Sequence, residues 1–239
     1  MEHRQVVERF IEAHFPAAAI AVVAGSTARG TRTSTSDIDL LLIGEDVFTG
    51  SRFRADPSGE DRQSLAGGFE FEDEFLEVFA YTPKGYEEWA GRGLAQFRPV
   101  IVHMLVEGVE VRGGAALAEL RMQWARALAA GPVVDAHAVD LRRYIITDQL
   151  DDLRDSSDPL ERQVVAGLLF ERIAELMLLV ERRWIGAGKY LPRRLRELSV
   201  ERADALAQPL LARDFETFAT RVERELDLAG GRVQAGFVR

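Results

Sequence analysis

The sequence of 239 residues contains no cysteine, and this absence excludes several kinds of chemistry. Without cysteine there is no disulfide framework, no thiol nucleophile and no cysteine-ligated zinc site. Histidine is scarce as well, because His3, His14, His103 and His137 are scattered and show no metal-ligand spacing. No apolar run approaches the roughly 20 residues that a membrane-spanning helix needs. The amphipathic stretch that follows Met1 differs from a secretory signal, so we expect a cytoplasmic protein without a membrane partner.

Positive charge is also in deficit. The chain has 30 Lys and Arg residues against 39 Asp and Glu residues, which gives a net charge of −9. Proteins that neutralise many phosphates normally present a basic face, so we expect no nucleic-acid partner. The acidic balance favours a small and cationic substrate instead. The length allows one large domain or two small ones, each with its own core, and we expect a monomer or a homodimer.

One motif combines glycine with acidic residues. In it, Gly25-Ser26 is followed, after a spacer of ten residues, by Asp37-Ile38-Asp39 and the apolar residues 40–43. Alternate residues of a strand share a face, so Asp37 and Asp39 should project together, about 6.5–7 Å apart. Two such carboxylates can bind a pair of Mg²⁺ ions about 3.5–4 Å apart. Gly25 lets the backbone approach a phosphate, and Ser26 offers a hydroxyl and an N–H. The motif predicts a nucleoside triphosphate bound with divalent metal.

An ordinary turn followed by the start of a strand is the alternative for the same residues, because Gly-Ser and Thr-Ser-Asp are common at such places. Asp39 argues against it, since this acid adjoins four aliphatic residues. A carboxylate buried there without a partner would cost several kcal/mol of stability. A metal ion would partner both acids at once.

This segment resembles the signature of the polymerase-β-type nucleotidyltransferase superfamily. The resemblance implies a third acid, flanked by hydrophobic residues, on a neighbouring strand. The segment that fits best is Leu76-Glu77-Val78, although many relatives carry Asp there. A solvated strand residue is the alternative for Glu77.

The resemblance further implies a mechanism in which an acceptor oxygen attacks the α-phosphate of a nucleoside triphosphate and pyrophosphate leaves. We expect ATP as the co-substrate and two Mg²⁺ ions as cofactors. The resemblance assigns the metal to Asp37, Asp39 and Glu77. It assigns the β- and γ-phosphates to Ser26 and the backbone around Gly25. Arg29 and Arg32 lie in the same loop, where they either assist in phosphate binding or are solvated arginines.

Hydrophobic periodicity predicts an α+β fold in two domains. Residues 1–114 are expected to form the nucleotidyltransferase domain, with a mixed β-sheet flanked by helices, and residues 115–239 a helical bundle that binds the acceptor. In the first domain the expected strands are 18–24, 37–43, 69–72, 75–81 and 108–114, the helices are 2–14, 83–90 and 94–106, and 51–68 is a loop. In the second domain the expected helices are 117–130, 139–154, 160–183 and 215–228.

Acidic residues recur along the helix expected from Val139. Asp148 and Asp152 share one stripe, and Asp148, Asp151 and Asp155 share an overlapping one. A transferase needs a base for the acceptor hydroxyl, and Asp148 belongs to both stripes, so we assign that role to Asp148. A solvated face of an amphipathic helix is the alternative.

The segment Trp184-Ile185-Gly186-Ala187-Gly188-Lys189-Tyr190 resembles a stretch of antibiotic nucleotidyltransferases. Lys189 would then contact triphosphate oxygens as a point charge. A helix junction, with Gly188 as its cap and Lys189 at its negative end, is the alternative. The resemblance implies transfer to a hydroxyl of an aminoglycoside- or lincosamide-type antibiotic, and thus antibiotic resistance. A nucleotidyltransferase that modifies a protein, as AMPylating antitoxins do, and a tRNA-directed enzyme are the alternatives.

Overall fold

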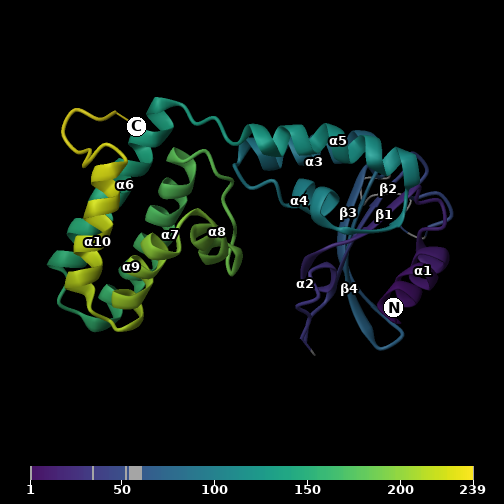
Figure 1. Ribbon diagram of the computed structural model, residues 1–239, viewed down its shortest axis with the longest axis horizontal. Helices are drawn as coiled ribbons and strands as arrows, with labels where there is room; N and C mark the ends of the chain where they lie inside the picture. Colours follow the sequence, from purple (N-terminus) through teal and green to yellow (C-terminus); the bar gives the residue numbers. More distant parts are fainter. Residues whose placement is uncertain (1, 34, 52, 54–60, 239) are drawn as a thin grey trace. The chain divides into compact units, whose positions relative to one another are not determined.

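The chain forms two compact units, Met1–Ala130 and Gly131–Arg239. The computed structural model describes residues 2–33, 35–51, 53 and 61–238, which are shown in Figure 1. The first unit combines a β-sheet with helices, and the second is helical, which confirms the predicted α+β class. Within the described part of the chain, no helix has both the length and the apolar character needed to cross a membrane.

The first unit is built on a mixed sheet with the strand order β3-β4-β2-β1-β5. Strands β2 and β4 run parallel, whereas β1–β2, β1–β5 and β3–β4 are antiparallel pairs. Because β2 and β4 are neighbours and run parallel, both strands begin at the same edge of the sheet. The strands are β1 (Ile20–Val23), β2 (Ile38–Ile43), β3 (Ser64–Phe71), β4 (Glu74–Tyr81) and β5 (Val109–Arg112).

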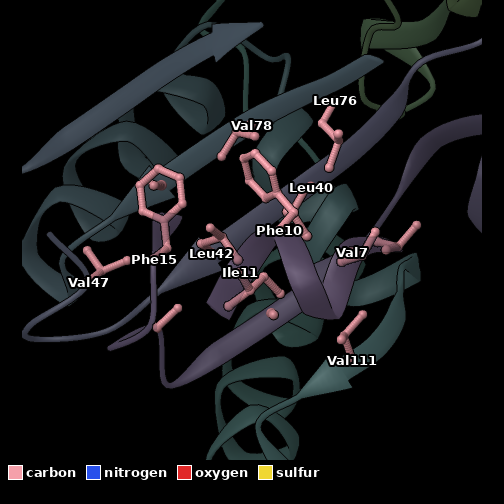
Figure 2. Close-up of a cluster of buried hydrophobic side chains, with 14 of the residues drawn as sticks. Val7, Phe10, Ile11, Phe15, Leu40, Leu42, Val47, Leu76, Val78 and Val111 are labelled. Carbon is pink, nitrogen blue, oxygen red and sulfur yellow. The ribbon is translucent and has the colours of Figure 1, made fainter. Parts of the chain in front are cut away.

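One face of this sheet is covered by α1 (Glu2–His14). Its residues Val7, Phe10 and Ile11 are fully buried, as the helical spacing predicts. They pack with Leu40 and Leu42 of β2, and Figure 2 shows these side chains together in one cluster. This cluster fixes the side of β2 that faces α1.

The opposite face is covered by three helices, α3 (Pro83–Ala95), α4 (Val100–Glu107) and α5 (Gly114–Ala130). Here Leu41 and Ile43 of β2 pack in a second buried cluster with Tyr86 and Trp124, because successive strand residues alternate between the two faces. The α3 helix begins at Thr82, whose side chain accepts a hydrogen bond from the Gly85 N–H at 3.1 Å, while Pro83 occupies the first turn.

The second unit contains five helices among the residues described. They are α6 (Ala136–Asp155), α7 (Pro159–Val180), α8 (Tyr190–Leu198), α9 (Val200–Leu211) and α10 (Phe215–Leu228). Helix α7 contributes more buried residues than any other helix of this unit, and it contacts α6, α8, α9 and α10. Its start is specified locally, because the Asp158 carboxylate accepts hydrogen bonds from the N–H groups of Leu160 and Glu161, each at 2.9 Å.

The expected boundaries differ from the observed ones at several places. Strand β3 begins at Ser64, inside the segment 51–68 that we expected to be a loop, of which residues 52 and 54–60 lie outside the described residues. Helix α3 extends to Ala95 and α4 begins at Val100, whereas one helix had been expected over 94–106. Helices α8 and α9 were not predicted, because Pro192 and Pro209 interrupt their sequence pattern.

The boundary between the two units also differs from the expected one at 114/115. Helix α5 belongs to the first unit, which ends at Ala130. The physical reason is that Leu117 and Trp124 of α5 are buried in the cluster beneath the sheet. The acceptor-binding role assigned to the helical half remains a prediction.

Candidate metal centre

Three carboxylates converge where strands β2 and β4 begin. Asp39 lies on β2, Asp37 directly precedes this strand, and Glu77 lies on β4. One oxygen of each acid lies within 4.8 Å of the others, and all three residues are half-buried. Oxygen donors in this number suit a hard divalent cation such as Mg²⁺. The structure thus brings together the three acids that the sequence analysis selected for metal binding.

The pairing of β2 with β4 explains why Glu77 is the third acid. Asp39 and Glu77 are direct neighbours in the parallel register. Asp39 shares a strand face with Leu41 and Ile43, which are buried beneath α3–α5. A shift of the strand by one residue would expose these apolar side chains, so the hydrophobic core fixes the position of the acids.

Gly25 closes one side of this group of acids. Its φ angle is +64°, in the left-handed region that favours glycine, and it begins the single turn α2 (Gly25–Ala28). A Cβ atom built on Gly25 would lie 1.6 Å from Oδ2 of Asp39. The main chain of Asp39 is held close as well, since its carbonyl accepts a hydrogen bond from the Ala24 N–H at 2.8 Å. Only glycine at position 25 leaves room for the Asp39 carboxylate.

These features fit a divalent metal ion. Three carboxylates of the same charge at this separation repel one another, and a cation would relieve the repulsion. The missing side chain at Gly25 leaves the Asp39 carboxylate beside bare backbone. If a metal binds, Asp37, Asp39 and Glu77 are the residues of this chain that would hold it.

The remaining residues predicted to bind nucleotide in the first unit lie around the α2 turn. Ser26 is half-buried in this turn, and its carbonyl accepts a hydrogen bond from the Thr31 N–H at 3.0 Å. Arg29 is exposed at the end of the turn. Both residues thus belong to the turn that Gly25 begins, and the Arg29 N–H donates to the Gly25 carbonyl at 3.3 Å.

Arg32, the other arginine of this loop, is held by protein groups. Its guanidinium binds the Glu74 carboxylate, with Nη1 3.0 Å from Oε1, and donates to the Ser36 carbonyl from Nη2 at 2.9 Å. The neighbouring guanidinium holds the pKa of Glu74 below its usual value, mainly through this hydrogen bond. Sequence reasoning had assigned Arg32 to phosphate and had no signal for Glu74, which lies 42 residues away.

Two further predicted residues belong to the second unit. Asp148 lies on α6 and is exposed, as is Asp152 one turn later. Lys189 directly precedes α8, and its Nζ lies 5.7 Å from the centre of the Tyr190 ring. Asp151, which shares a stripe with Asp148, is engaged by Arg232, whose Nη2 lies 2.6 Å from Oδ1. Asp151 is therefore engaged by the C-terminal segment.

A family model covers the part of the chain that carries this site. Residues 4–84 match the family model described as a nucleotidyltransferase domain, and this range includes all three acids and Gly25. Among solved structures, the chain is similar to a nucleotidyltransferase-like protein from Exiguobacterium sibiricum 255-15, at 14% identity and a TM-score of 0.48, over 95% of this chain and 77% of that one. No curated protein matches the chain.

Proposed function

We propose that the chain transfers a nucleoside monophosphate to a hydroxyl group of a small molecule, and the premise is the match of residues 4–84 to the family model described as a nucleotidyltransferase domain. The observation that carries the proposal is the convergence of Asp37, Asp39 and Glu77 beside the bare backbone of Gly25. We further propose ATP as the donor, two Mg²⁺ ions as cofactors and an aminoglycoside- or lincosamide-type antibiotic as the acceptor.

The residues of the first unit would bind the donor. Mg²⁺ supplies neutralisation of phosphate charge and polarisation of phosphoryl oxygens. Asp37, Asp39 and Glu77 hold the metal, and the Ser26 hydroxyl and the backbone at Gly25 bind the β- and γ-phosphates. Arg29, exposed at the end of the α2 turn, adds positive charge near the same phosphates.

The second unit would bind the acceptor. The exposed acids Asp148, Asp152 and Asp155 follow one another at spacings of four and three along α6, and thus form one negative stripe suited to a cationic molecule. In the proposed step, Asp148 takes the proton of the acceptor hydroxyl. The acceptor oxygen then bonds to the α-phosphorus, the bond to the β-phosphate oxygen breaks, and pyrophosphate leaves with that electron pair.

The experiment that tests this proposal follows the nucleotide label. The purified full chain is incubated with Mg²⁺, each α-labelled nucleoside triphosphate and hydroxyl-bearing amines of the aminoglycoside and lincosamide classes. The label is then measured in the small-molecule, protein and RNA fractions, and pyrophosphate is measured in parallel. We expect label in an amine acceptor in an amount equal to the pyrophosphate released, and no labelled product with Asp39→Asn.

The other fractions decide between the alternatives. Label that appears in a protein from a cell extract, with none in any small amine, would favour the protein-modifying enzyme. Label on tRNA would favour the tRNA-directed class. Activity that survives in Asp39→Asn would contradict the assignment of the site itself.

A further inference from the structure

Arg32 lies at the end of the parallel β2–β4 ladder. The backbone register of these strands begins at the pair Ile38–Leu76, just before the acids Asp39 and Glu77. Ahead of that pair, the two chains are joined by the side chain of Arg32, which contacts the Ser36 carbonyl on one chain and the Glu74 carboxylate on the other. Arg32 therefore extends the connection between the strands by two residues beyond the ladder.

The guanidinium of Arg32 is engaged mainly by protein groups. Arginine carries five N–H donors. Nε and Nη2 point to the Ser36 carbonyl at 3.2 and 2.9 Å, Nη1 and Nη2 to the two oxygens of Glu74, and Nη1 also lies 2.9 Å from Nδ1 of His3. The side chains of Arg32 and Glu74 are each only 20% exposed, so water competes little for these contacts.

These contacts act on the residue next to Asp37. Arg32 fixes the Ser36 carbonyl, and Ser36 directly precedes Asp37. On the other side, the hydroxyl of Thr27 donates to the Asp37 carbonyl at 3.3 Å, and Ile38 is fully buried. The main chain of Asp37 is thus held from both sides, while Asp39 and Glu77 are held by the ladder itself.

We infer that Arg32 is a positioning residue for the metal centre, which fixes Asp37 against Glu77, and that Glu74 orients Arg32 for this role. The inference rests on the proposed function, because it takes Asp37 as a metal ligand. Arg32 acts through the backbone of Ser36 and does not touch the triphosphate. A lysine would keep the charge at position 32 but would lose the planar fork that joins Ser36 to Glu74.

The chain offers a matched control in the Arg9–Glu72 pair. This pair also joins an arginine of the first unit to the β3–β4 hairpin, with Nε of Arg9 2.8 Å from Oε1 of Glu72. It contacts neither Ser36 nor Asp37 in any hydrogen bond described for these side chains. Loss of this pair should therefore change stability without changing the metal centre.

The test measures Mn²⁺ binding to the full chain without nucleotide, by electron paramagnetic resonance, for wild type and for Arg32→Ala, Arg32→Lys, Glu74→Gln and Arg9→Ala. Outer contacts of metal ligands typically change affinity about 10- to 100-fold, and we expect a loss of that size in Arg32→Ala. Arg32→Lys should restore little of it, Glu74→Gln should weaken binding less, and Arg9→Ala should match wild type. The melting temperature of each variant separates loss of folding from loss of metal.

Steady-state kinetics give a second readout. A positioning role predicts that Arg32→Ala lowers kcat and requires more metal, while the KM for the nucleotide at saturating metal changes little. Wild-type Mn²⁺ affinity in Arg32→Ala, or full rescue by Arg32→Lys, would overturn the inference. Asp39→Asn distinguishes this from failure of the proposed function, since unchanged Mn²⁺ binding in that variant would mean that the acids are not the metal site at all.

Discussion

The carboxylate of Asp39 occupies the space that a side chain at Gly25 would need. A Cβ atom at position 25 would lie 1.6 Å from Oδ2 of Asp39, far inside any contact distance. The two residues come from different elements, because Gly25 begins the α2 turn after β1 and Asp39 lies on β2. Their contact makes the glycine a part of the metal centre and not merely a turn residue.

We predict that Gly25→Ala loses divalent metal binding and transfer activity together. The new methyl group must displace the Asp39 carboxylate, and the backbone at φ +64° adds strain. Mn²⁺ binding and labelled-nucleotide transfer, measured on the same preparation, check the prediction.

Gly30→Ala is the matched control, because Gly30 has nearly the same angle, φ +67°, but nothing within 4 Å of its Cβ position. It should lose about 1 kcal/mol of stability from backbone strain and keep its metal affinity. Equal metal affinity in the two variants would show that the contact with Asp39 has no consequence.

We predict that Asp39→Asn abolishes transfer but leaves the fold intact, since the volume of the side chain is unchanged. Without metal the variant should melt at the same or a higher temperature than wild type, because one of three mutually repelling charges is gone. Melting curves with Mg²⁺ and with a chelator check this prediction. Glu70→Gln, at an exposed position of β3, is the control and should behave as wild type in both conditions.

The central part of this site was predictable from sequence because its residues obey local rules. The period of two along a strand places Asp37 and Asp39 on one face, and the pattern Leu76-Glu77-Val78 marks a neighbouring strand with one polar residue among apolar ones. The observed register puts Glu77 directly beside Asp39. Each of these steps needs only neighbours in sequence and the burial of apolar residues.

Other features depend on contacts that no short segment reveals. Gly67 and Gly68 suggested a loop, yet Gly68 is paired with Glu77 in β3, and a Cβ there would lie 2.4 Å from the ring of Phe75. Gly68 is thus a strand residue, and the ring of Phe75 occupies the space that a side chain at this position would need. In the same way, the Arg32–Glu74 pair joins residues 42 positions apart, and only the packed sheet brings them together.

We predict that the Arg32–Glu74 pair makes the stability of the first unit depend on acid pH. The folded pKa of Glu74 lies below the ordinary value of 4.5, so the pair stabilises the fold fully above that pH. The stabilisation is then lost as the pH falls through the lower, folded pKa. Denaturant unfolding of wild type and Glu74→Gln at neutral pH and at about pH 3 should show a stability difference that shrinks in acid.

Glu72→Gln is the control for this pH dependence. The pKa of Glu72 is also lowered by its arginine, Arg9. Both side chains are well exposed, however, since 50% of the Arg9 side chain and 40% of the Glu72 side chain are accessible. Water screens such a pair, so the effect at neutral pH should be smaller than for Glu74→Gln. A larger effect for Glu72→Gln would contradict the importance of the Arg32 contacts.

We predict that Lys189→Ala weakens binding of the nucleoside triphosphate, because the proposed role of Lys189 is contact with its phosphates. The neighbouring Arg193 is a suitable comparison, since its guanidinium carbon also lies close to the Tyr190 ring, 5.2 Å from the centre. Nucleotide binding with Mg²⁺, measured by calorimetry, should fall for Lys189→Ala and stay near wild type for Arg193→Ala. Equal losses would indicate a diffuse effect of positive charge on α8.

The acceptor base gives the prediction that separates a small-molecule transferase from the other classes. Asp148→Asn should leave nucleotide and Mg²⁺ binding intact, while transfer falls by roughly 10² to 10⁴, the usual range of general-base catalysis. The loss should shrink as the pH rises, because hydroxide partly replaces the missing base.

Asp151→Asn is the comparison on the same helix. Asp151 accepts hydrogen bonds from Arg232 and Gln234, at 2.6 and 3.1 Å. Asp151→Asn should therefore lower the melting temperature and leave the pH dependence of transfer unchanged. If Asp148→Asn keeps wild-type kcat, the stripe on α6 is a solvated helix face, and the search for the base moves to Asp152 and Glu77.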